Sequence, residues 1–590
     1  MNEKPKSFWK KPLTGLRKVL AWLALFAVVN FVMTYLIVFA AATPLPVSVM
    51  LVIGTVIAIF CVVVILFIRW LCSWRNFRRF LFGVACLVTV IALFYAEENW
   101  RGKHAWKKFK AEWEANGEIL DFVGIIPPPV PDDQNFATTP IIATAYAMWF
   151  DTNGNRHPYA TNFVNQLQIP TELGILNFTD RMRGWPQGEK TDLKAWQEYY
   201  QRLAALTNYF PHASQPQKPV EDILLALSKY DATIEKLRVA SKLPYARFPL
   251  GYTDDNPAGI LLPHLAPLKV CTITLQLRAI AELQSDQTEK ALDDIKLMLR
   301  LTESVRTEPF LISHLVRIAL WQIALQPIWE SLADHKWTDA QLAALDAELG
   351  KLDFLADYQL SIRGERAGGV GIIDFLRRNR NQLAHIADET DFQMTMFRLA
   401  PGGWFEQNKI STCRMHNEYF LPVINLEKRA FSFTVETQAS EALDTLVNRH
   451  NAYEWFSRQL LPAMHKASRK FVQAQSFTDM ARIAIALERY RLAHGNIPET
   501  LDALTPQFME KIPHDIIGGK PLKYHRTGPP STLRSAATED GSPGSTGAAS
   551  QFVLYSVGWN ETDDGGTIAL TKGGSVDFNQ GDWVWRYPDK

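Results

Sequence analysis

The first 96 residues contain three long runs of apolar residues. Residues 19–42 and 47–68 carry no charged side chain, and each run exceeds the ~20 residues that cross a hydrocarbon core. Only Thr43-Pro44-Leu45-Pro46 separates them, which predicts a helical hairpin with a very short turn. The third run, residues 80–96, sits at the lower length limit for a span. We therefore predict a transmembrane module at residues 1–96 with three spans, and two spans as the alternative.

A charged helix and a proline-rich spacer are predicted at residues 97–136. Residues 97–116 interleave aromatic side chains with Lys and Arg, and Asn116-Gly117 is a typical helix end. Four of the five residues 127–131 are proline, a composition that favours an extended polyproline segment. We interpret it as a spacer or as a strap across the rest of the protein.

Residues 137–475 have the pattern of a helical body. Apolar positions recur every three or four residues in three segments, 268–283, 288–307 and 309–332. Thr338 with Gln341 three residues later predicts the capped start of a further helix. Shorter helices are expected at 192–206 and 220–241, and glycine clusters at 368–371 and 401–403 are interpreted as breaks between elements.

The pattern changes again at residues 476–590, where we predict a small α+β module. A helix over 479–494 ends at Gly495, and alternating segments at 521–525, 552–557, 567–570 and 583–587 indicate strands. Residues 528–550 consist largely of Gly, Ser, Thr, Ala and Pro, which predicts a disordered loop inserted in a hairpin. The predicted fold class is thus mainly α, with transmembrane helices, a large helical body and this module.

Charge then suggests an orientation for the membrane module. Residues 1–100 hold ten Lys/Arg and three acidic residues, a net +7, whereas the rest of the chain is −6. The N-terminus and the expected loop at 69–79 carry these positive charges, so both should be cytoplasmic. Three spans would place the body outside the cytoplasmic membrane, in the periplasm, and two would leave it in the cytosol. Ala40-Ala41-Ala42 also fits a signal-peptide cleavage site, a less favoured interpretation.

Composition excludes several functional classes. Five cysteines in 590 residues are too few for a disulfide-built scaffold, and the sequence alone does not decide whether Cys271 and Cys413 pair. A net charge of +1 argues against a dedicated nucleic-acid-binding protein. The three apolar runs contain no Asp, Glu, Lys, Arg or His, which disfavours ion or proton transport.

The C-terminal fifth carries a family resemblance. The segments 486–491, 494–501, 513–515 and 519–524, followed by a strand at 552–558 and the acidic Gly loop 563–566, resemble the soluble half of type II secretion major pseudopilins. The resemblance implies a pseudopilin-like module at about 478–590. The whole chain, including segments 98–103 and 308–313, also resembles a family of large bacterial membrane-anchored proteins, and no activity comes with that likeness.

One metal site follows from the resemblance, because pseudopilins of this type can bind calcium in acidic C-terminal loops. Asn560, Glu561, Asp563 and Asp564 offer four oxygen-bearing side chains within five residues, which suits a hard cation. The competing interpretation is a solvated turn between strands. No other cofactor is expected.

Other candidate chemistry is weak at the level of sequence. The chain has no nucleophile elbow, zinc-protease motif, phosphate loop or dinucleotide fingerprint. Cys413 with His416 and His514 with Asp515 are interpreted as structural, and Arg363 with Glu365 and Arg366 as an ion-paired helix end. We therefore expect a non-enzymatic envelope protein that contacts the lipid bilayer and other envelope or secretion proteins. A membrane-tethered hydrolase acting on an envelope polymer is the alternative, and a cytosolic sensor follows only from two spans.

Overall fold

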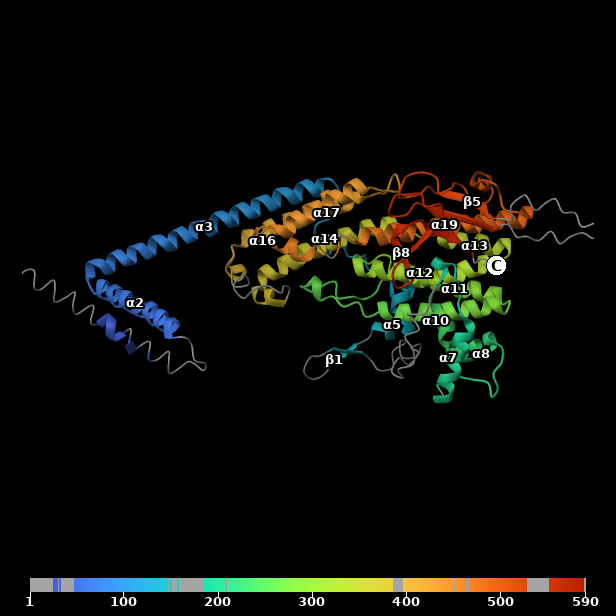
Figure 1. The fold of residues 1–590 in the computed structure, drawn as a ribbon, viewed down its shortest axis with the longest axis horizontal. Helices are drawn as coiled ribbons and strands as arrows, with labels where there is room; N and C mark the ends of the chain where they lie inside the picture. The colour runs from blue at the N-terminus through green and yellow to red at the C-terminus, as the bar shows by residue number, and fades with distance from the viewer. Residues whose placement is uncertain are drawn as a thin grey trace, which may run out of the picture. The chain divides into compact units, whose positions relative to one another are not determined.

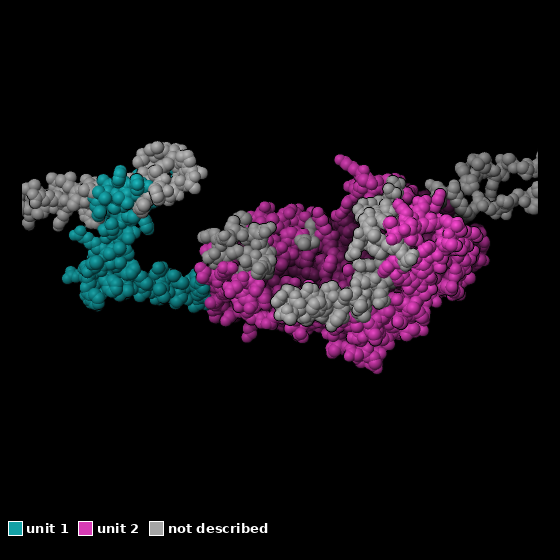
Figure 2. Space-filling view, turned by 90° about the horizontal axis from the view of Figure 1, so that it is seen from below, with its two compact units in different colours: residues 1–98 teal, residues 99–590 magenta. Residues whose placement is uncertain are grey.

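The structure is a computed structural model of the 590-residue chain. It describes residues 25–29, 31–32, 35, 47–146, 148–150, 156–158, 184–206, 209–385, 396–449, 451–462, 464, 466–527 and 551–587. The chain divides into two compact units, residues 1–98 and residues 99–590, which Figure 2 shows in different colours. The expected span at 19–42 falls largely outside the described residues, and the low-complexity insertion 528–550 lies wholly outside them.

The first unit contains α2 (Val47–Leu71) and the beginning of α3 (Trp74–Ala115). The expected loop at 69–79 is wrong, because only Cys72 and Ser73 separate the two helices. The cluster Arg75, Arg78 and Arg79 lies in the first turns of α3, since arginine is a good helix former and no Gly or Pro interrupts the segment. The helix expected over 97–116 is confirmed as the second half of α3, and Gly117 follows it with φ +84°.

Two helices in the described part of the chain are long and apolar enough to cross a membrane. The first is α3, whose most apolar window is 0% buried, and the second is α12 (Leu311–Ala333), whose window is 67% buried. The burial of α12 identifies it as a core helix of the second unit. The expected span at 47–68 coincides with α2, where Thr55–Leu71 forms a shorter apolar stretch.

The second unit is mainly helical, and the colours of Figure 1 show the order of its helices along the chain. Besides α12, the α-helices described in this unit are α4 (Phe122–Ile125), α5 (Pro140–Tyr146), α7 (Leu193–Leu206), α8 (Pro219–Leu227), α9 (Asp231–Ala240), α10 (Leu265–Gln284), α11 (Thr288–Glu303), α13 (Asp339–Leu349), α14 (Phe354–Arg378), α16 (Gly402–Arg414), α17 (Phe433–Asn448), α18 (Trp455–Leu460) and α19 (Ala467–His494). A π-helical segment, η9 (Met415–Phe420), extends α16 directly.

The periodic helices of the body are confirmed as α10, α11 and α12, which pack against one another. The predicted cap of α13 is also present, because Thr338 Oγ1 accepts from the N–H of Gln341 at 3.3 Å and Gln341 Oε1 accepts from the N–H of Thr338 at 3.0 Å. The helix expected over 220–241 is instead α8 and α9, separated by a 3-10 turn at Ser228–Tyr230. The spacing of apolar residues predicts which face of a helix is buried. A short 3-10 turn leaves that spacing nearly unchanged, so the sequence pattern did not reveal the break between α8 and α9.

The interpretation of Gly368–Gly371 as a break is wrong, because this cluster lies inside α14. Its glycines, with Gly364 one turn earlier, bring the helix close to its neighbours. A Cβ on Gly364 would lie 1.6 Å from the carbonyl oxygen of Pro309, and one on Gly371 would lie 2.8 Å from Pro257 Cγ. Gly364 and Gly371 therefore allow close packing against α14, and the cluster does not reverse the chain.

The proline-rich segment is extended, as expected, and it contacts the body. Ile126 and Pro131 at its two ends have φ/ψ near −60°/+135°, which is polyproline geometry. Arg247 Nε donates to the carbonyl oxygen of Pro127 at 2.9 Å. The segment therefore lies across residues that follow it by more than a hundred positions.

The C-terminal strands form two small antiparallel sheets. The first has the order β5 (Lys523–Thr527), β6 (Gln551–Ser556), β9 (Trp583–Arg586), and the second pairs β7 (Ile568–Leu570) with β8 (Val576–Gly581). The four expected strands are confirmed, whereas β8 was missed. Further two-stranded pairs are β1 (Met148–Phe150) with β2 (Arg156–Pro158) and β3 (Ile424–Asn425) with β4 (Ala430–Phe431).

One hydrophobic core joins these sheets to the helical body. Helix α19 begins at Ala467, so the expected boundary between body and module at 475/476 falls inside it. Phe477 of α19 packs edge-on against Trp185, at 4.6 Å between ring centroids, and Trp185 contacts Trp585 of β9 at 5.7 Å. The sheet, α19 and the body helices thus share a single core.

Candidate functional site

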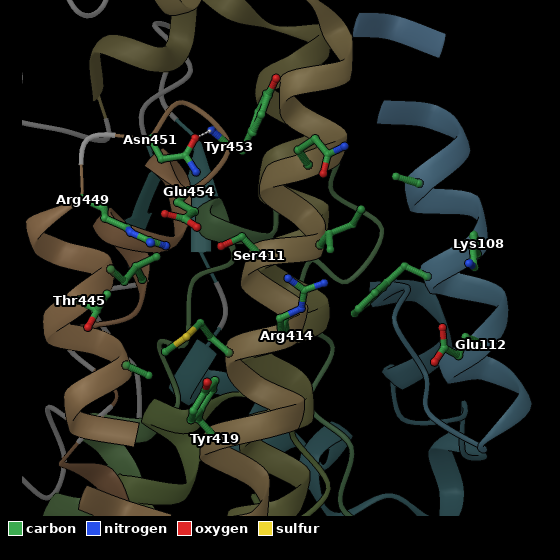
Figure 3. A pocket seen from close by; sticks show the side chains of 17 residues that line it. Lys108, Glu112, Ser411, Arg414, Tyr419, Thr445, Arg449, Asn451, Tyr453 and Glu454 are labelled. Atoms are coloured by element: carbon green, nitrogen blue, oxygen red, sulfur yellow. Dashed lines mark hydrogen bonds between the residues drawn. The ribbon is translucent and has the colours of Figure 1, made fainter. Parts of the chain in front are cut away.

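An open groove of about 720 Å³ lies in the second unit. Figure 3 shows the C-terminal half of α3 as one wall, α16 and η9 as the floor, and α17 with the following loop as the other wall. The floor and lower walls are apolar, formed by Phe109, Ile410, Met415, Tyr419, Ala442 and Leu446. The rim is charged, with Lys108 and Glu112 on one wall and Arg449 and Glu454 on the other, while Ser411 and Arg414 of α16 add polar groups between the walls.

The α3 wall is fixed by aromatic packing. Trp106, Phe109 and Trp113 recur at helical spacing and pack against a buried cluster that contains Val370 and Cys413. At the start of this half, Asn99 Oδ1 accepts from the N–H of Gly403 at 2.9 Å, beside a close contact of Gly102 with Gly403. The Lys409 ammonium lies 4.4 Å from the Trp106 ring centroid, a cation–π contact.

The groove floor includes the π-helical segment η9. Met415 and Tyr419 of this segment both line the groove. The ring of His416 faces inward, and its Nδ1 lies 2.7 Å from the carbonyl oxygen of Thr412. Burial lowers the pKa of His416 to about 4, so the imidazole is neutral at pH 7. Single π turns of this kind are frequent at functional sites.

Charges on the rim are only partly paired. The Lys108 ammonium and the Arg449 guanidinium have no ion pair with any described residue, whereas Arg414 Nε lies 3.4 Å from Glu418 Oε1. Glu454 Oε2 is buried and has no hydrogen-bond partner in the described structure. Figure 3 shows Arg449 and Glu454 on one wall and Lys108 and Glu112 on the other. The rim can therefore offer both an anion site and a cation site.

The acidic loop proposed as a calcium site is held by protein contacts. Asp563 accepts from Tyr555 Oη at 3.0 Å and lies 3.1 Å from Lys523 Nζ, and these hydrogen bonds, led by Lys523, lower the pKa of Asp563. Asn560 Nδ2 donates to Asp564 Oδ2 at 2.8 Å, and Glu561 occupies a turn with φ +55°. Across the described ranges, no group of three or more His, Cys, Asp or Glu side chains could hold a metal ion.

Asp582, which the sequence did not single out, organises this loop. Its side chain is 1% exposed and accepts from three backbone N–H groups, those of Asp564, Gly566 and Thr567, at 2.6–3.3 Å. It lies in Gly581-Asp582-Trp583, where a carboxylate between buried strand residues was the only available signal.

The remaining sequence candidates are structural. Cys413 is fully buried, and burial raises the pKa of its thiol to about 12. Cys271 is also buried, and both cysteines are free thiols. His514 and Asp515 form the expected turn, in which the buried Asp515 carboxylate accepts from Ser556 Oγ at 2.8 Å and from the N–H of Ile517 at 3.0 Å.

The expected ion pairing of Arg363 and Arg366 is confirmed, although these residues lie within α14 and not at its end. Both guanidinium groups bind Glu118, at 2.9 and 2.7 Å. Burial acts to raise the pKa of Glu118, but the hydrogen bonds from the two arginines outweigh it and lower the pKa. Glu365 accepts from the N–H of Leu311 at 2.9 Å.

A buried polar cluster, absent from the sequence predictions, lies where α10, α12 and α14 meet. His264 Nε2 lies 2.8 Å from Glu308 Oε1, and Ser313 Oγ donates to the other oxygen of Glu308. Arg317 lies 3.0 Å from Asp357, and it also pairs with a glutamate of α11. His264, Ser313 and Arg317 are 0% exposed. The hydroxyl and the imidazole both contact the carboxylate, so they are not arranged as a nucleophile with its base.

A second buried cluster joins α10 to α11. Asp294 is 0% exposed and accepts from Arg238 Nη2 at 2.6 Å, while Arg278 lies 3.5 Å from Asp294 and 3.4 Å from Glu282. Burial raises the pKa of both carboxyl groups. Arg238 and Arg278 thus compensate the buried charge of Asp294 and Glu282, and we interpret the cluster as structural.

Comparisons with protein-family models, with curated proteins and with solved structures find no match to this chain. The resemblance of residues 478–590 to pseudopilins therefore stays a prediction.

Proposed function

We propose that this chain is a membrane-anchored scaffold protein of the bacterial envelope, with a cytoplasmic N-terminus and a periplasmic body. Helix α3 carries the proposal. Its apolar window is 0% buried, and the same helix continues into the body, where Trp106 and Trp113 pack against a buried cluster. An unburied apolar stretch of this length is stable in a hydrocarbon environment, and one continuous helix would join that stretch to the body.

The state of the reactive side chains supports a role without catalysis. Cys271 and Cys413 are buried, and burial raises the pKa of both thiols, so neither is a thiolate nucleophile at pH 7. His314 and His416 are buried too, and burial lowers their pKa to about 3 and about 4. These groups stabilise the body, and the proposed function is to hold and present surfaces.

Strand β5 is the surface we propose for an envelope or secretion partner. In the sheet order β5-β6-β9, β5 has a described partner strand on one side only, and most of its residues are exposed. An unpaired strand edge offers backbone N–H and C=O groups to an added strand. Lys523 is paired with Asp563, but His525 and Arg526, whose contact with the exposed Glu499 is 4.0 Å long, favour an acidic partner segment.

The anchoring half of the proposal is tested with alkaline phosphatase and green fluorescent protein fused in turn to Lys590. We expect phosphatase activity without fluorescence. In the variant Val88→Asp/Ile91→Asp, each carboxylate costs about 2.5–3.5 kcal/mol at the centre of a span, so the third span should fail and the pattern should reverse. The variant Val88→Leu/Ile91→Leu is the control. Fluorescence from the unaltered chain would contradict a periplasmic body.

The scaffold half is tested by photo-crosslinking in cells. A photoreactive residue in place of His525 on β5 should give a discrete crosslinked product with an envelope protein. The same residue in place of Lys351, which is exposed in the turn after α13, is the matched control. Equal product patterns from the two positions would argue against β5 as the interaction surface.

A further inference from the structure

The groove between α3, α16 and α17 combines an apolar floor with unpaired charges of both signs. Ile410, Met415 and Leu446 of the floor are 6–7% exposed. On the α17 wall, Arg449 has no ion pair with any described residue, and Glu454 Oε2 is buried without a hydrogen-bond partner. The Glu454 side chain lines the groove, and a ligand with a donor group would give its carboxylate the hydrogen bond that the protein does not supply.

Backbone contacts hold both charged residues at the mouth of the groove. Arg449 ends α17, where its N–H donates to the carbonyl oxygens of Thr445 and Leu446. Glu454 precedes α18, and its N–H donates to the carbonyl oxygen of Asn451 at 3.1 Å. Arg449 and Glu454, five positions apart in the chain, thus place a guanidinium and a carboxylate on one wall, as Figure 3 shows. The pair is complementary to a ligand that carries both an anionic group and an ammonium group.

The opposite wall indicates where such a ligand comes from. Ala105, the first groove residue of α3, follows the apolar run ending at Ala96 by nine residues, or about 13 Å of α-helix. In the proposed membrane-anchored protein, phospholipid is therefore the amphiphile supplied to the helix that forms this wall. A volume of about 720 Å³ suits one small amphiphile or the polar end of a larger one.

We propose that the groove binds one phospholipid whose headgroup contains a phosphate and a primary amine, as in phosphatidylethanolamine. Glu454 accepts hydrogen bonds from the ammonium, Arg449 binds the phosphate, and the acyl chains lie along Ile410, Met415 and Leu446. The supply of lipid rests on the membrane anchoring proposed above, and the binding site itself rests on the groove alone.

Binding is tested by native mass spectrometry of the full chain in detergent. The probes are dioleoylphosphatidylethanolamine, dioleoylphosphatidylglycerol, which has the phosphate but no amine, and glycerophosphoethanolamine, which has the headgroup but no acyl chains. We expect one phosphatidylethanolamine per chain, bound about tenfold more tightly than phosphatidylglycerol, the discrimination of one charge-assisted hydrogen bond. Glycerophosphoethanolamine should not compete.

Two groove variants separate the roles of the charges. Glu454→Gln should remove the preference for phosphatidylethanolamine, and Arg449→Gln should weaken the binding of both lipids about tenfold. Glu441→Gln on the exposed face of α17 and Lys428→Gln between β3 and β4 are the matched controls and should bind as the unaltered chain does. Unchanged melting temperatures would confirm that the variants fold.

Several results would overturn the proposal: equal binding of the two lipids by the unaltered chain, unchanged binding by Glu454→Gln, competition by glycerophosphoethanolamine, or a peptide in place of lipid on the protein purified from cells. Binding in detergent does not depend on membrane orientation. A failure of the reporter fusions therefore contradicts the anchoring, and a failure here contradicts only the lipid site.

Discussion

Asp357 illustrates how single residues carry the energetics of the body. It is buried on α14 beside Arg317, and the opposed effects of burial and this arginine leave its pKa raised to about 7, with burial dominant. The folded state therefore favours the neutral carboxyl group. Its contribution to stability is fully present below the ordinary pKa near 4 and is lost as pH rises through about 7.

The variant Asp357→Asn should remove this pH dependence, because the amide imitates the neutral carboxyl at every pH. Relative to the unaltered chain, the free energy of unfolding of the variant should be higher at pH 8 than at pH 5 by about 1–3 kcal/mol. Thermal unfolding at both pH values measures the difference. Asp286→Asn, at an aspartate whose side chain is 80% exposed, should show no such change. Equal shifts in the two variants would contradict a preference for the neutral carboxyl group at Asp357.

His314, nearby on α12, acts in the opposite direction. Burial, assisted by Arg317, lowers the pKa of His314 to about 3. Its contribution to stability is present above the ordinary pKa of 6.5 and is lost as pH falls toward 3. The two residues therefore narrow the pH range of maximum stability from both sides.

At the scale of elements, α14 shows what glycine does inside a helix. Gly364 lets the helix approach the backbone of Pro309, whereas Gly368, one turn later, has no atom within 4 Å of an added Cβ. Both glycines lie on the same helix, so replacing either one with alanine changes the intrinsic helix propensity equally. Only the packing around the added methyl group distinguishes the two substitutions.

Gly364→Ala should destabilise the protein by about 3 kcal/mol or more, because the clashing atom belongs to backbone that cannot rotate away. Gly368→Ala should stabilise it by about 0.5–1 kcal/mol through helix propensity. Thermal melting of the two variants beside the unaltered chain makes the comparison. A similar shift of the same sign in both would show that the contact with Pro309 relaxes without cost.

The same helix explains how far the sequence predicts the structure. The helices α10 to α13 were predictable because their signals, apolar spacing and the Thr338 cap, lie within one segment. The glycines of α14 respond to Pro309 and Pro257, which are distant in sequence, so the pattern alone suggested a break. The groove was not predictable for the same reason, because its residues come from 105–112, 407–419 and 442–454 and no local motif joins them.

At the scale of the whole molecule, α19 unites the parts that the sequence suggested were separate. It packs against α12, α13 and α14 and also against β6 and β9. Trp583 and Trp585 of β9 are 0–1% exposed in the shared core. The second unit should therefore unfold as one cooperative body.

Comparison of chains comprising 99–475 and 99–590 tests this unity. The longer chain should give one sharp thermal transition and a structured near-ultraviolet circular dichroism spectrum. The shorter chain keeps only the first turns of α19 and lacks Phe477 and Trp585, so we expect it to aggregate or to lose fixed tertiary packing. A folded, soluble 99–475 chain would show that the module is an independent domain.

The position of α19 along the chain also has a consequence for biosynthesis. A ribosome synthesises α10 to α14 well before it synthesises α19. Three of these early helices, α12, α13 and α14, pack against α19 in the folded protein. Until α19 emerges, their apolar faces are exposed to whatever compartment receives them, and unpartnered faces of this kind aggregate. Efficient production should therefore depend on a chaperone that shields those helices, and a slower ribosome would lengthen the period of risk.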